Sequence, residues 1–173
     1  MGHYCNQYHF NTFKLNEFLL ERAAAIGIKI TEDKIESVSL KEGIDVLHGE
    51  KRKYKADFYI DATGFKKLLI SKLGAKWGSF NLPMNEAIAF QTPDTENYNT
   101  WTLAKAMTAG WLWRIPTYGR WGNGYVYDNR YINKEKAQKE VEKYLGYSIT
   151  INKHIKFDAG ALDQVWIKNC VAM

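Results

Sequence analysis

The sequence is poor in the residues that mark disulfide-rich secreted proteins. Among its 173 residues there are two cysteines, Cys5 and Cys170, and three prolines. The cysteines lie near opposite ends of the chain, with neither a Cys-x-x-Cys spacing nor the cysteine density of a secreted scaffold. We therefore expect a cytoplasmic protein whose cysteines are ordinary thiols.

Long hydrophobic runs and strong charge clusters are also missing. No apolar run approaches the roughly 18 residues of a membrane span, and the N-terminus lacks the basic-then-apolar order of a signal peptide. Lysine and arginine (24) exceed aspartate and glutamate (19) to give a net charge of +5, but the basic residues are scattered. A basic stripe interleaved with aromatic residues would indicate nucleic-acid binding, and the sequence has no such stripe. The sequence therefore predicts neither a nucleic acid nor a membrane as partner.

Several motifs of known chemistry are absent or incomplete. There is no Gly-x-Ser-x-Gly elbow for a serine nucleophile. The dinucleotide signature Gly-x-Gly-x-x-Gly is missing as well, and Gly122-Asn123-Gly124 supplies only two of its glycines, so we interpret it as a hairpin turn. His3, Cys5 and His9 fit no zinc spacing and lack a fourth ligand nearby. We expect no metal site.

What is present is the composition of a folded domain, with 46% hydrophobic and 14% aromatic residues. One domain of this length can bury a sizeable core. Apolar residues at three- and four-residue steps predict an amphipathic helix from Leu15 to Ile26, with Asn11 or Thr12 as its cap. Shorter patterns predict strands at Ile28–Ile30, at Ile35–Leu40 and Ile44–Leu47 joined as a hairpin, and at Tyr54–Ile60, followed by a short helix that ends at Gly74.

The composition of the chain changes from about residue 76. Five of the six tryptophans lie between Trp77 and Trp121. Candidate strands near Ala87–Gln91, Trp111–Ile115 and Tyr125–Tyr127 predict a mixed sheet, and a helix with one charged side is expected over Lys134–Leu145.

One candidate binding motif is Asp61-Ala62-Thr63-Gly64, at the end of a predicted strand. Backbone N–H groups and a glycine at this position could accept a phosphate or ribose. The alternative is a plain turn between a strand and a helix. The residues by themselves leave both interpretations open.

A second candidate is the run Gly110-Trp111-Leu112-Trp113-Arg114-Ile115-Pro116. On a strand, Trp111 and Trp113 project from the same face and present two flat rings side by side. Such a face suits a planar ligand, but paired indoles can also be core. Pro116 is expected to end the strand, which would place the pair close to its rim.

The pattern Trp-x-Trp-x-Ile-Pro at 111–116 resembles the signature of the flavin-dependent tryptophan halogenase family. Other segments resemble the family in the same order: 8–11, 60–65 with 68–70, 119–127 and 166–172. The resemblance implies an α/β fold, a partial FAD-binding Rossmann-like structure of the aromatic hydroxylase and halogenase type with a mixed β-sheet substrate region. It implies one incomplete domain, with an FAD-associated part (1–75), the sheet with the signature (76–133) and a return toward the FAD part (134–173).

The resemblance also implies a chemistry. In the family, reduced FAD and oxygen give a hydroperoxide that oxidises halide, and a lysine directs the oxidant onto an electron-rich ring such as an indole. The implied cofactor is FAD, supplied as FADH2 by a separate flavin reductase, with halide and O2 as co-substrates. The implied partners are that reductase and an indole-like small molecule, and a homodimer is allowed. The active-site lining carried over by position is Trp111, Trp113, Ile115 and Pro116, and the cofactor contacts are Ile35, Asp61, Ala62, Thr63 and Gly64.

The sequence also departs from the family pattern. It contains neither the glycine-rich pyrophosphate turn nor the catalytic lysine, and it lacks the Glu-Pro-Leu-Glu stretch. Asn11 replaces an aspartate, and Ala161 stands where an arginine is common. We therefore expect an internal fragment that holds no catalytic residue, binds FAD weakly by itself and does not turn over. The alternatives are a related flavin monooxygenase, or a non-catalytic remnant that binds an aromatic ligand or a protein.

Overall fold

The computed structural model describes residues 8–95 and 100–173 and shows two compact units. The first unit combines Met1–Ile28 with Leu82–Phe157, and the second combines Lys29–Asn81 with Asp158–Met173. Each unit has a hydrophobic core of its own. The units are described separately below.

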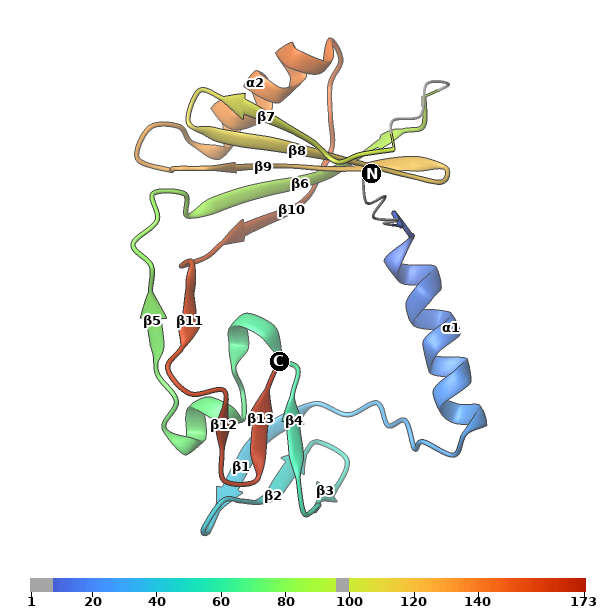
Figure 1. Ribbon diagram of the computed structural model, residues 1–173, viewed down its shortest axis with the longest axis vertical. Coiled ribbons are helices and arrows are strands. Elements are labelled where there is room, and N and C mark those ends of the chain that lie inside the picture. The colour runs from blue at the N-terminus through green and yellow to red at the C-terminus, as the bar shows by residue number, and fades with distance from the viewer. Residues whose placement is uncertain (1–7, 96–99) are drawn as a thin grey trace, which may run out of the picture. The chain divides into compact units, whose positions relative to one another are not determined.

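The first unit is built on a five-stranded sheet with the order β10-β6-β9-β8-β7. Its strands run side by side and every pairing is antiparallel, so the prediction of a mixed sheet is wrong for this region (Figure 1). Two-residue connections join β7 to β8 and β8 to β9, and antiparallel neighbours need only such a tight turn whereas parallel ones need a long crossover. The strands are β6 (Glu86–Pro93), β7 (Leu103–Met107), β8 (Gly110–Thr117), β9 (Arg120–Tyr127) and β10 (Ile151–Lys156).

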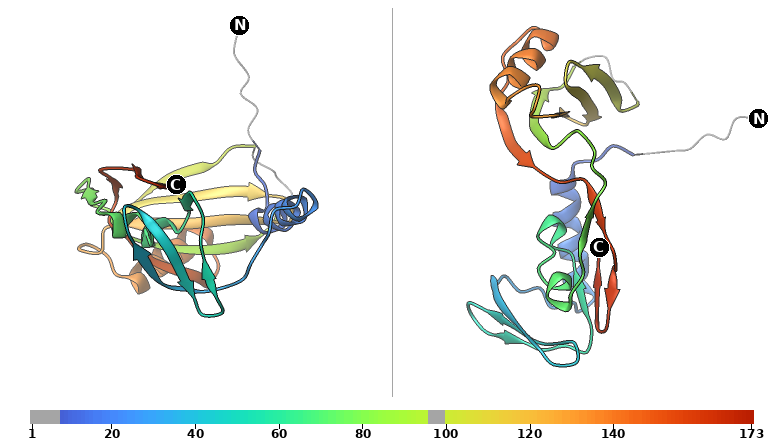
Figure 2. Two further views of the ribbon diagram at one scale, coloured as in Figure 1. Left: turned by 90° about the horizontal axis from the view of Figure 1, so that it is seen from below. Right: turned by 90° about the vertical axis from the view of Figure 1, so that its left-hand side faces the viewer.

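Helix α2 (Lys134–Leu145) covers one face of this sheet, as predicted from its pattern (Figure 1, Figure 2). It begins at Asn133, whose side chain accepts a hydrogen bond from the Lys136 amide at 2.9 Å, and ends at Gly146 in the left-handed region. Ala137 and Val141 of the helix are fully buried. They join a core that also contains Ile88, Phe90, Leu112, Tyr125, Tyr127, Ile132 and Ile149.

The hairpin of β8 and β9 turns earlier than the sequence predicted. Tyr118 and Gly119 form the turn, and Gly119 has a φ of +83°. Gly122-Asn123-Gly124 lies inside β9, so its interpretation as a turn is wrong. Pro116 also does not end β8, which continues to Thr117. β7 pairs with β8 only as far as Arg114, so the proline nitrogen faces a side on which no strand of the described residues remains.

Helix α1 (Thr12–Ala25) confirms the predicted N-terminal helix and selects Asn11 as its cap. The Asn11 side chain accepts a hydrogen bond from the Phe13 amide at 3.0 Å. None of the helix residues is buried, and Phe18 and Leu19 are more than half exposed. The periodic pattern therefore predicted the helix, but burial of its apolar side depends on tertiary packing.

The second unit consists of three small sheets. One has the order β1-β2-β3, another β12-β13-β4, and the third pairs β11 with β5. Only the pairing of β13 with β4 is parallel. The strands are β1 (Ile35–Leu40), β2 (Ile44–Gly49), β3 (Lys53–Tyr54), β4 (Tyr59–Asp61), β5 (Trp77–Ser79), β11 (Gly160–Leu162), β12 (Trp166–Ile167) and β13 (Cys170–Ala172).

The predictions for the second unit are partly confirmed. The hairpin of β1 and β2 is confirmed, and the predicted helix before Gly74 is a 3₁₀-helix, η2 (Ile70–Leu73). The strand predicted over Tyr54–Ile60 divides into β3 and β4, because Tyr54 pairs with β2 whereas Tyr59 pairs with β13. The strand predicted at Ile28–Ile30 is wrong, since these β-prone residues have no neighbouring strand to pair with in the described chain.

Asn169 joins two of these sheets through its side-chain amide. Its Oδ1 accepts a hydrogen bond from the Ile44 amide and its Nδ2 donates to the Ile44 carbonyl, each at 2.9 Å. The Asn169 carbonyl also accepts from the Tyr59 amide at 2.9 Å. Ile44 and Tyr59 are buried beside Leu69, Ile70 and Cys170, which together form the core of this unit.

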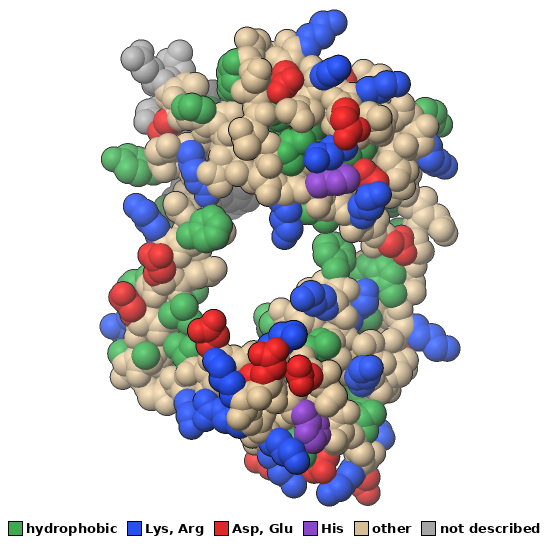
Figure 3. Space-filling model, turned by 180° about the vertical axis from the view of Figure 1, so that it is seen from behind, with side chains coloured by type: hydrophobic (Ala, Val, Ile, Leu, Met, Phe, Trp, Pro, Cys, Tyr) green, Lys and Arg blue, Asp and Glu red, His purple; other side chains and the backbone are tan. Residues whose placement is uncertain are grey.

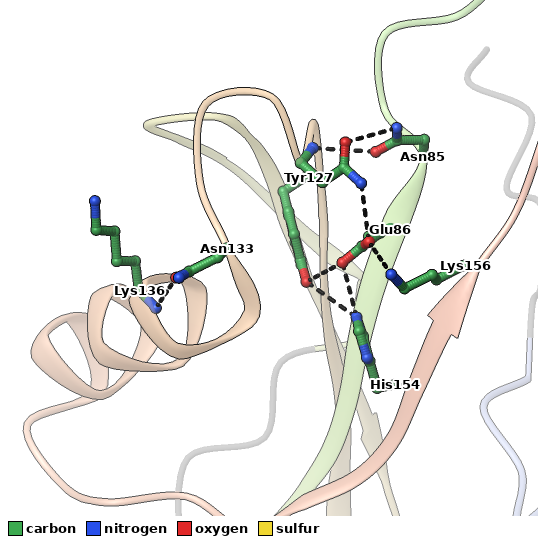
Figure 4. A network of polar contacts seen from close by, with 8 residues as sticks. Asn85, Glu86, Tyr127, Asn133, Lys136, His154 and Lys156 are labelled. Carbon is green, nitrogen blue, oxygen red and sulfur yellow. Dashed lines mark hydrogen bonds and ion pairs between the residues drawn. The ribbon is translucent and has the colours of Figure 1, made fainter.

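A buried carboxylate, Glu86, ties three strands of the first unit together (Figure 4). Its Oε2 accepts from the Tyr127 hydroxyl and contacts the His154 ring nitrogen Nε2, both at 2.9 Å. Its Oε1 accepts from Asn129 at 2.9 Å and pairs with Lys156 at 3.1 Å. Glu86 is 5% exposed. Burial alone would raise its pKa, but the bonds from Asn129, His154, Lys156 and Tyr127 lower the pKa to about 2.

The surface shows mixed charge. On the face in Figure 3, basic and acidic side chains are interspersed over both units. Within residues 8–95 and 100–173, neither α-helix has the length and apolar character required to cross a membrane.

Candidate cofactor pocket and aromatic face

The second unit contains a pocket at the carboxyl ends of its two parallel strands. β4 ends at Asp61 and β13 ends at Ala172, and both residues line the pocket together with Met173. The cavity has a volume of about 310 Å³. Ligands of α/β proteins bind outside the carboxyl ends of parallel strands, so the pocket occupies a position typical of a binding site. Its other lining residues are Gly64, Phe65, Lys67, Trp77, Leu162 and Val165.

Asp61 holds the turn that forms one wall of this pocket. Its Oδ1 accepts from the Thr63 amide at 3.1 Å and from the Thr63 hydroxyl at 2.6 Å. Its Oδ2 accepts from the amides of Leu69 at 2.8 Å and Ile70 at 2.9 Å. Burial would raise the pKa of Asp61, but the hydrogen bonds from Thr63, Ile70 and Leu69 together lower it.

These four bonds occupy the acceptor sites of the Asp61 carboxylate, which is 2% exposed. The side chain therefore positions the turn and has no free acceptor for a ribose. The segment 61–64 leads into the 3₁₀-helix η1 (Gly64–Lys66), and Gly64 has a φ of +59°. The turn is thus both a structural connection and part of the pocket wall.

Aromatic rings and one cation define the rest of the pocket. The rings of Phe65 and Trp77 meet edge to face, with centroids 6.4 Å apart and planes at 74°. The Lys67 ammonium lies 4.2 Å from the centroid of the Trp77 ring. An apolar cavity with aromatic walls and a cation suits one planar ring that carries negative charge.

In the first unit, the signature residues of β8 form an aromatic face. Trp111, Trp113 and Ile115 alternate with Leu112, which is in the core under α2, so they lie on the opposite face of the sheet. Trp111 is 39% exposed and Trp113 is partly buried. Neither indole belongs to the buried core. The face is therefore open to a planar ligand or to another part of a protein.

Small residues lie beside Trp113 on the neighbouring strands. Trp113 pairs with Gly124 of β9, and Gly124 pairs in turn with Ala89 of β6. A Cβ atom at Gly124 would lie 2.4 Å from Cζ2 of the Trp113 indole. The indole of Trp113 thus lies directly on the backbone of Gly124, which explains why position 124 inside this strand is a glycine.

The remaining predicted site residues lie elsewhere in their units. Pro116 is buried and, by alternation along β8, faces away from Trp111, Trp113 and Ile115. Ile35 is the first residue of β1 and does not line the pocket of the second unit. Of the three residues that the sequence analysis rejected as a metal site, His3 and Cys5 lie outside the described residues. Phe65, Lys67 and Trp77 were not predicted as pocket residues, because their proximity depends on how the chain folds between η1 and β5.

Replacing Gly124 with alanine should displace the Trp113 indole and lower the free energy of unfolding by about 1–3 kcal/mol, the usual cost of overpacking. The near-ultraviolet circular dichroism of the tryptophans should change as well. Gly122→Ala is the matched control, because a Cβ there would lie 3.9 Å from its nearest neighbours. If both variants keep the wild-type spectrum and stability, Trp113 does not depend on Gly124.

Solved structures of flavin-dependent halogenases share this fold. The tryptophan 6-halogenase SttH from Streptomyces toxytricini aligns with a TM-score of 0.89 and 32% identity, over 95% of this chain and 36% of that one. BrvH, a flavin-dependent halogenase from Brevundimonas sp. BAL3, aligns with a TM-score of 0.83 and 30% identity, over 91% of this chain and 34% of that one. The fold is that of a portion of a flavin-dependent halogenase.

Sequence comparisons agree with the structural ones. The family model for tryptophan halogenase matches residues 3–173. SttH is 33% identical over 178 residues, and the 7-chloro-L-tryptophan 6-halogenase KtzR from Kutzneria sp. (strain 744) is 34% identical over 178 residues. Each alignment covers 96% of this chain and 34% of the relative, so the chain spans about a third of their length. This chain belongs to the tryptophan halogenase family.

Proposed function

We propose that this chain is part of an FAD-dependent halogenase that modifies tryptophan, an indole or another electron-rich aromatic ring. The observation that carries the proposal is the open face of Trp111 and Trp113, with the Trp113 indole lying on Gly124. Two large rings on the same face of one strand provide a surface for a planar aromatic substrate. The family match includes this face and the pocket of the second unit.

The pocket of the second unit fits one ring system of FAD. Its volume of about 310 Å³ is at the lower end for small-molecule sites, so it suits a ring rather than a whole dinucleotide. Phe65, Trp77 and Lys67 would hold this portion of the cofactor, and the Asp61 turn would position Gly64 beside it. When bound and reduced, FAD supplies the redox chemistry with O2 and halide, and a flavin reductase supplies the reduced cofactor. The residues of this chain bind, orient and shield.

Replacing the matching third of SttH with this chain tests the proposal. We expect the chimera to bind FAD and to halogenate tryptophan when flavin reductase, NADH and halide are supplied. Trp111→Ala should reduce kcat by about 10- to 100-fold, because loss of one wall misplaces the ring that reacts. Trp101→Ala is the matched control, since Trp101 is 58% exposed in the same unit. Product mass and FAD absorbance are the measurements.

The products distinguish the alternatives. A folded chimera that holds FAD but yields only hydroxylated product would identify a flavin monooxygenase. A folded chimera that fails to hold FAD, or holds it without turnover, would favour a non-catalytic remnant that binds an aromatic ligand or a protein. Thermal unfolding of each chimera establishes that it is folded.

A further inference from the structure

Lys67 is in an unusual backbone conformation for a lysine. It follows η1 with a φ of +47°, in the left-handed region that favours glycine. Its side chain is partly buried, and its ammonium lies over the Trp77 ring at 4.2 Å. No carboxylate pairs with this ammonium in the ranges 8–95 and 100–173. A cation is therefore held at the pocket without an acidic partner.

Asp61, the acidic residue of the same pocket, forms no ion pair with the Lys67 ammonium. The Asp61 carboxylate accepts four hydrogen bonds from its own turn and is buried. It is fixed away from solvent, whereas the ammonium of Lys67 retains donors that the aromatic ring cannot satisfy. These donors can bind an anion that enters the pocket.

The shape and chemistry of the cavity limit what that anion can be. The walls are two aromatic rings and the aliphatic residues Leu162, Val165 and Ala172. The volume accommodates one ring system. We propose that Lys67 makes this pocket selective for a planar ring that carries phosphate, with the ring against Phe65 and Trp77 and the phosphate at the Lys67 ammonium. This inference rests on the proposed function, in which the pocket holds part of FAD.

Two pairs of ligands that differ only in phosphate test the inference: FMN against riboflavin, and ADP against adenosine. Their affinities for the purified chain are measured by equilibrium dialysis. In at least one pair, the phosphorylated ligand should bind roughly fivefold more tightly at low salt, the effect of one partly exposed ion pair, with less difference at high salt. An advantage for FMN assigns the flavin ring to the pocket, and an advantage for ADP assigns the adenine.

Lys67→Met should abolish this advantage, so that FMN binds no more tightly than riboflavin and ADP no more tightly than adenosine. Lys67→Gly should do the same, and because glycine adopts a positive φ without strain, this variant keeps the fold. The matched control is Lys66→Met, since Lys66 is the adjacent, exposed lysine and does not line the pocket. Thermal unfolding verifies each variant.

The outcomes separate this inference from the proposed function. If riboflavin or adenosine binds but phosphate gives no advantage, or the advantage survives in Lys67→Met, the role of Lys67 is wrong and the pocket remains a ring site. If none of the four ligands binds to the wild-type chain, both the role of Lys67 and the assignment of FAD to this pocket are overturned.

Discussion

Replacing Glu86 with alanine is expected to lower the free energy of unfolding of the first unit by about 3–5 kcal/mol, the cost of breaking a buried ion pair on one side. The substitution leaves Lys156 and His154 without their carboxylate and removes the acceptor for Tyr127 and Asn129. These residues come from β9, β10 and the loop after β9, so all three segments lose a side-chain contact with β6. Urea denaturation followed by circular dichroism measures the loss.

Two further variants show whether the charge or the general loss of a side chain is responsible. Glu86→Gln keeps an acceptor but loses the charge, so it should fall between the wild type and the alanine variant. Glu17→Ala removes a glutamate from the exposed surface of α1 in the same unit and should change stability by less than about 0.5 kcal/mol. A Glu86→Ala protein as stable as Glu17→Ala would contradict the network as a source of stability.

The same carboxylate predicts how stability depends on pH. Its pKa is about 2 in the folded protein and has an ordinary value of 4.5. The unfolded state therefore binds the proton more tightly, and the contribution of Glu86 is fully present above its ordinary pKa. The contribution is lost as the pH falls from about 4.5 toward 2. The wild type should lose more stability than Glu86→Gln over this interval.

Asp61→Asn is expected to destabilise the second unit by about 2–4 kcal/mol, because an amide nitrogen cannot accept hydrogen bonds from buried backbone donors. One side of the carboxylate binds the amides of Leu69 and Ile70, and the other binds Thr63. In either orientation of the asparagine side chain, its amide nitrogen faces donors on one of these two sides. The pocket wall should loosen, so the near-ultraviolet circular dichroism signal of Trp77 should weaken. The midpoint of unfolding should fall as well.

Asp57→Asn is the matched control for this prediction. Asp57 is an exposed aspartate four residues earlier in the same unit, so its substitution should be nearly neutral. Equal stability of Asp61→Asn and Asp57→Asn would show that the carboxylate of Asp61 does not hold the turn.

Local signals predicted much of the secondary structure. Helix α2 has the predicted bounds, and β1 also matches its prediction, because capping residues, turn residues and periodicity act within a few positions of the chain. The same local logic failed at Gly122-Asn123-Gly124. Two glycines are typical of a turn, and only the position of Trp113 on the neighbouring strand shows why Gly124 lies inside β9.

The residues of the candidate site also fall into two groups, those that a local pattern predicts and those that only tertiary contacts bring together. The sequence identified Trp111 and Trp113 as neighbours on one face, because alternation along a strand is a local property. It could not identify the pocket of Phe65, Lys67 and Trp77, which also includes residues from 162 onward. Contacts between residues so far apart depend on how strands pair, and pairing is not encoded by local periodicity.

By itself, the sequence determined both α-helices, the hairpin of β1 and β2 and, through ordered motifs, the family of this chain. The tertiary structure decided what those elements do: the parallel pairing of β4 and β13 creates the pocket, and four hydrogen bonds turn Asp61 from a candidate ligand into a support for its wall. The physical reason is that propensity and periodicity act over a few residues, whereas burial and hydrogen-bond partners are assigned only when distant segments pack together.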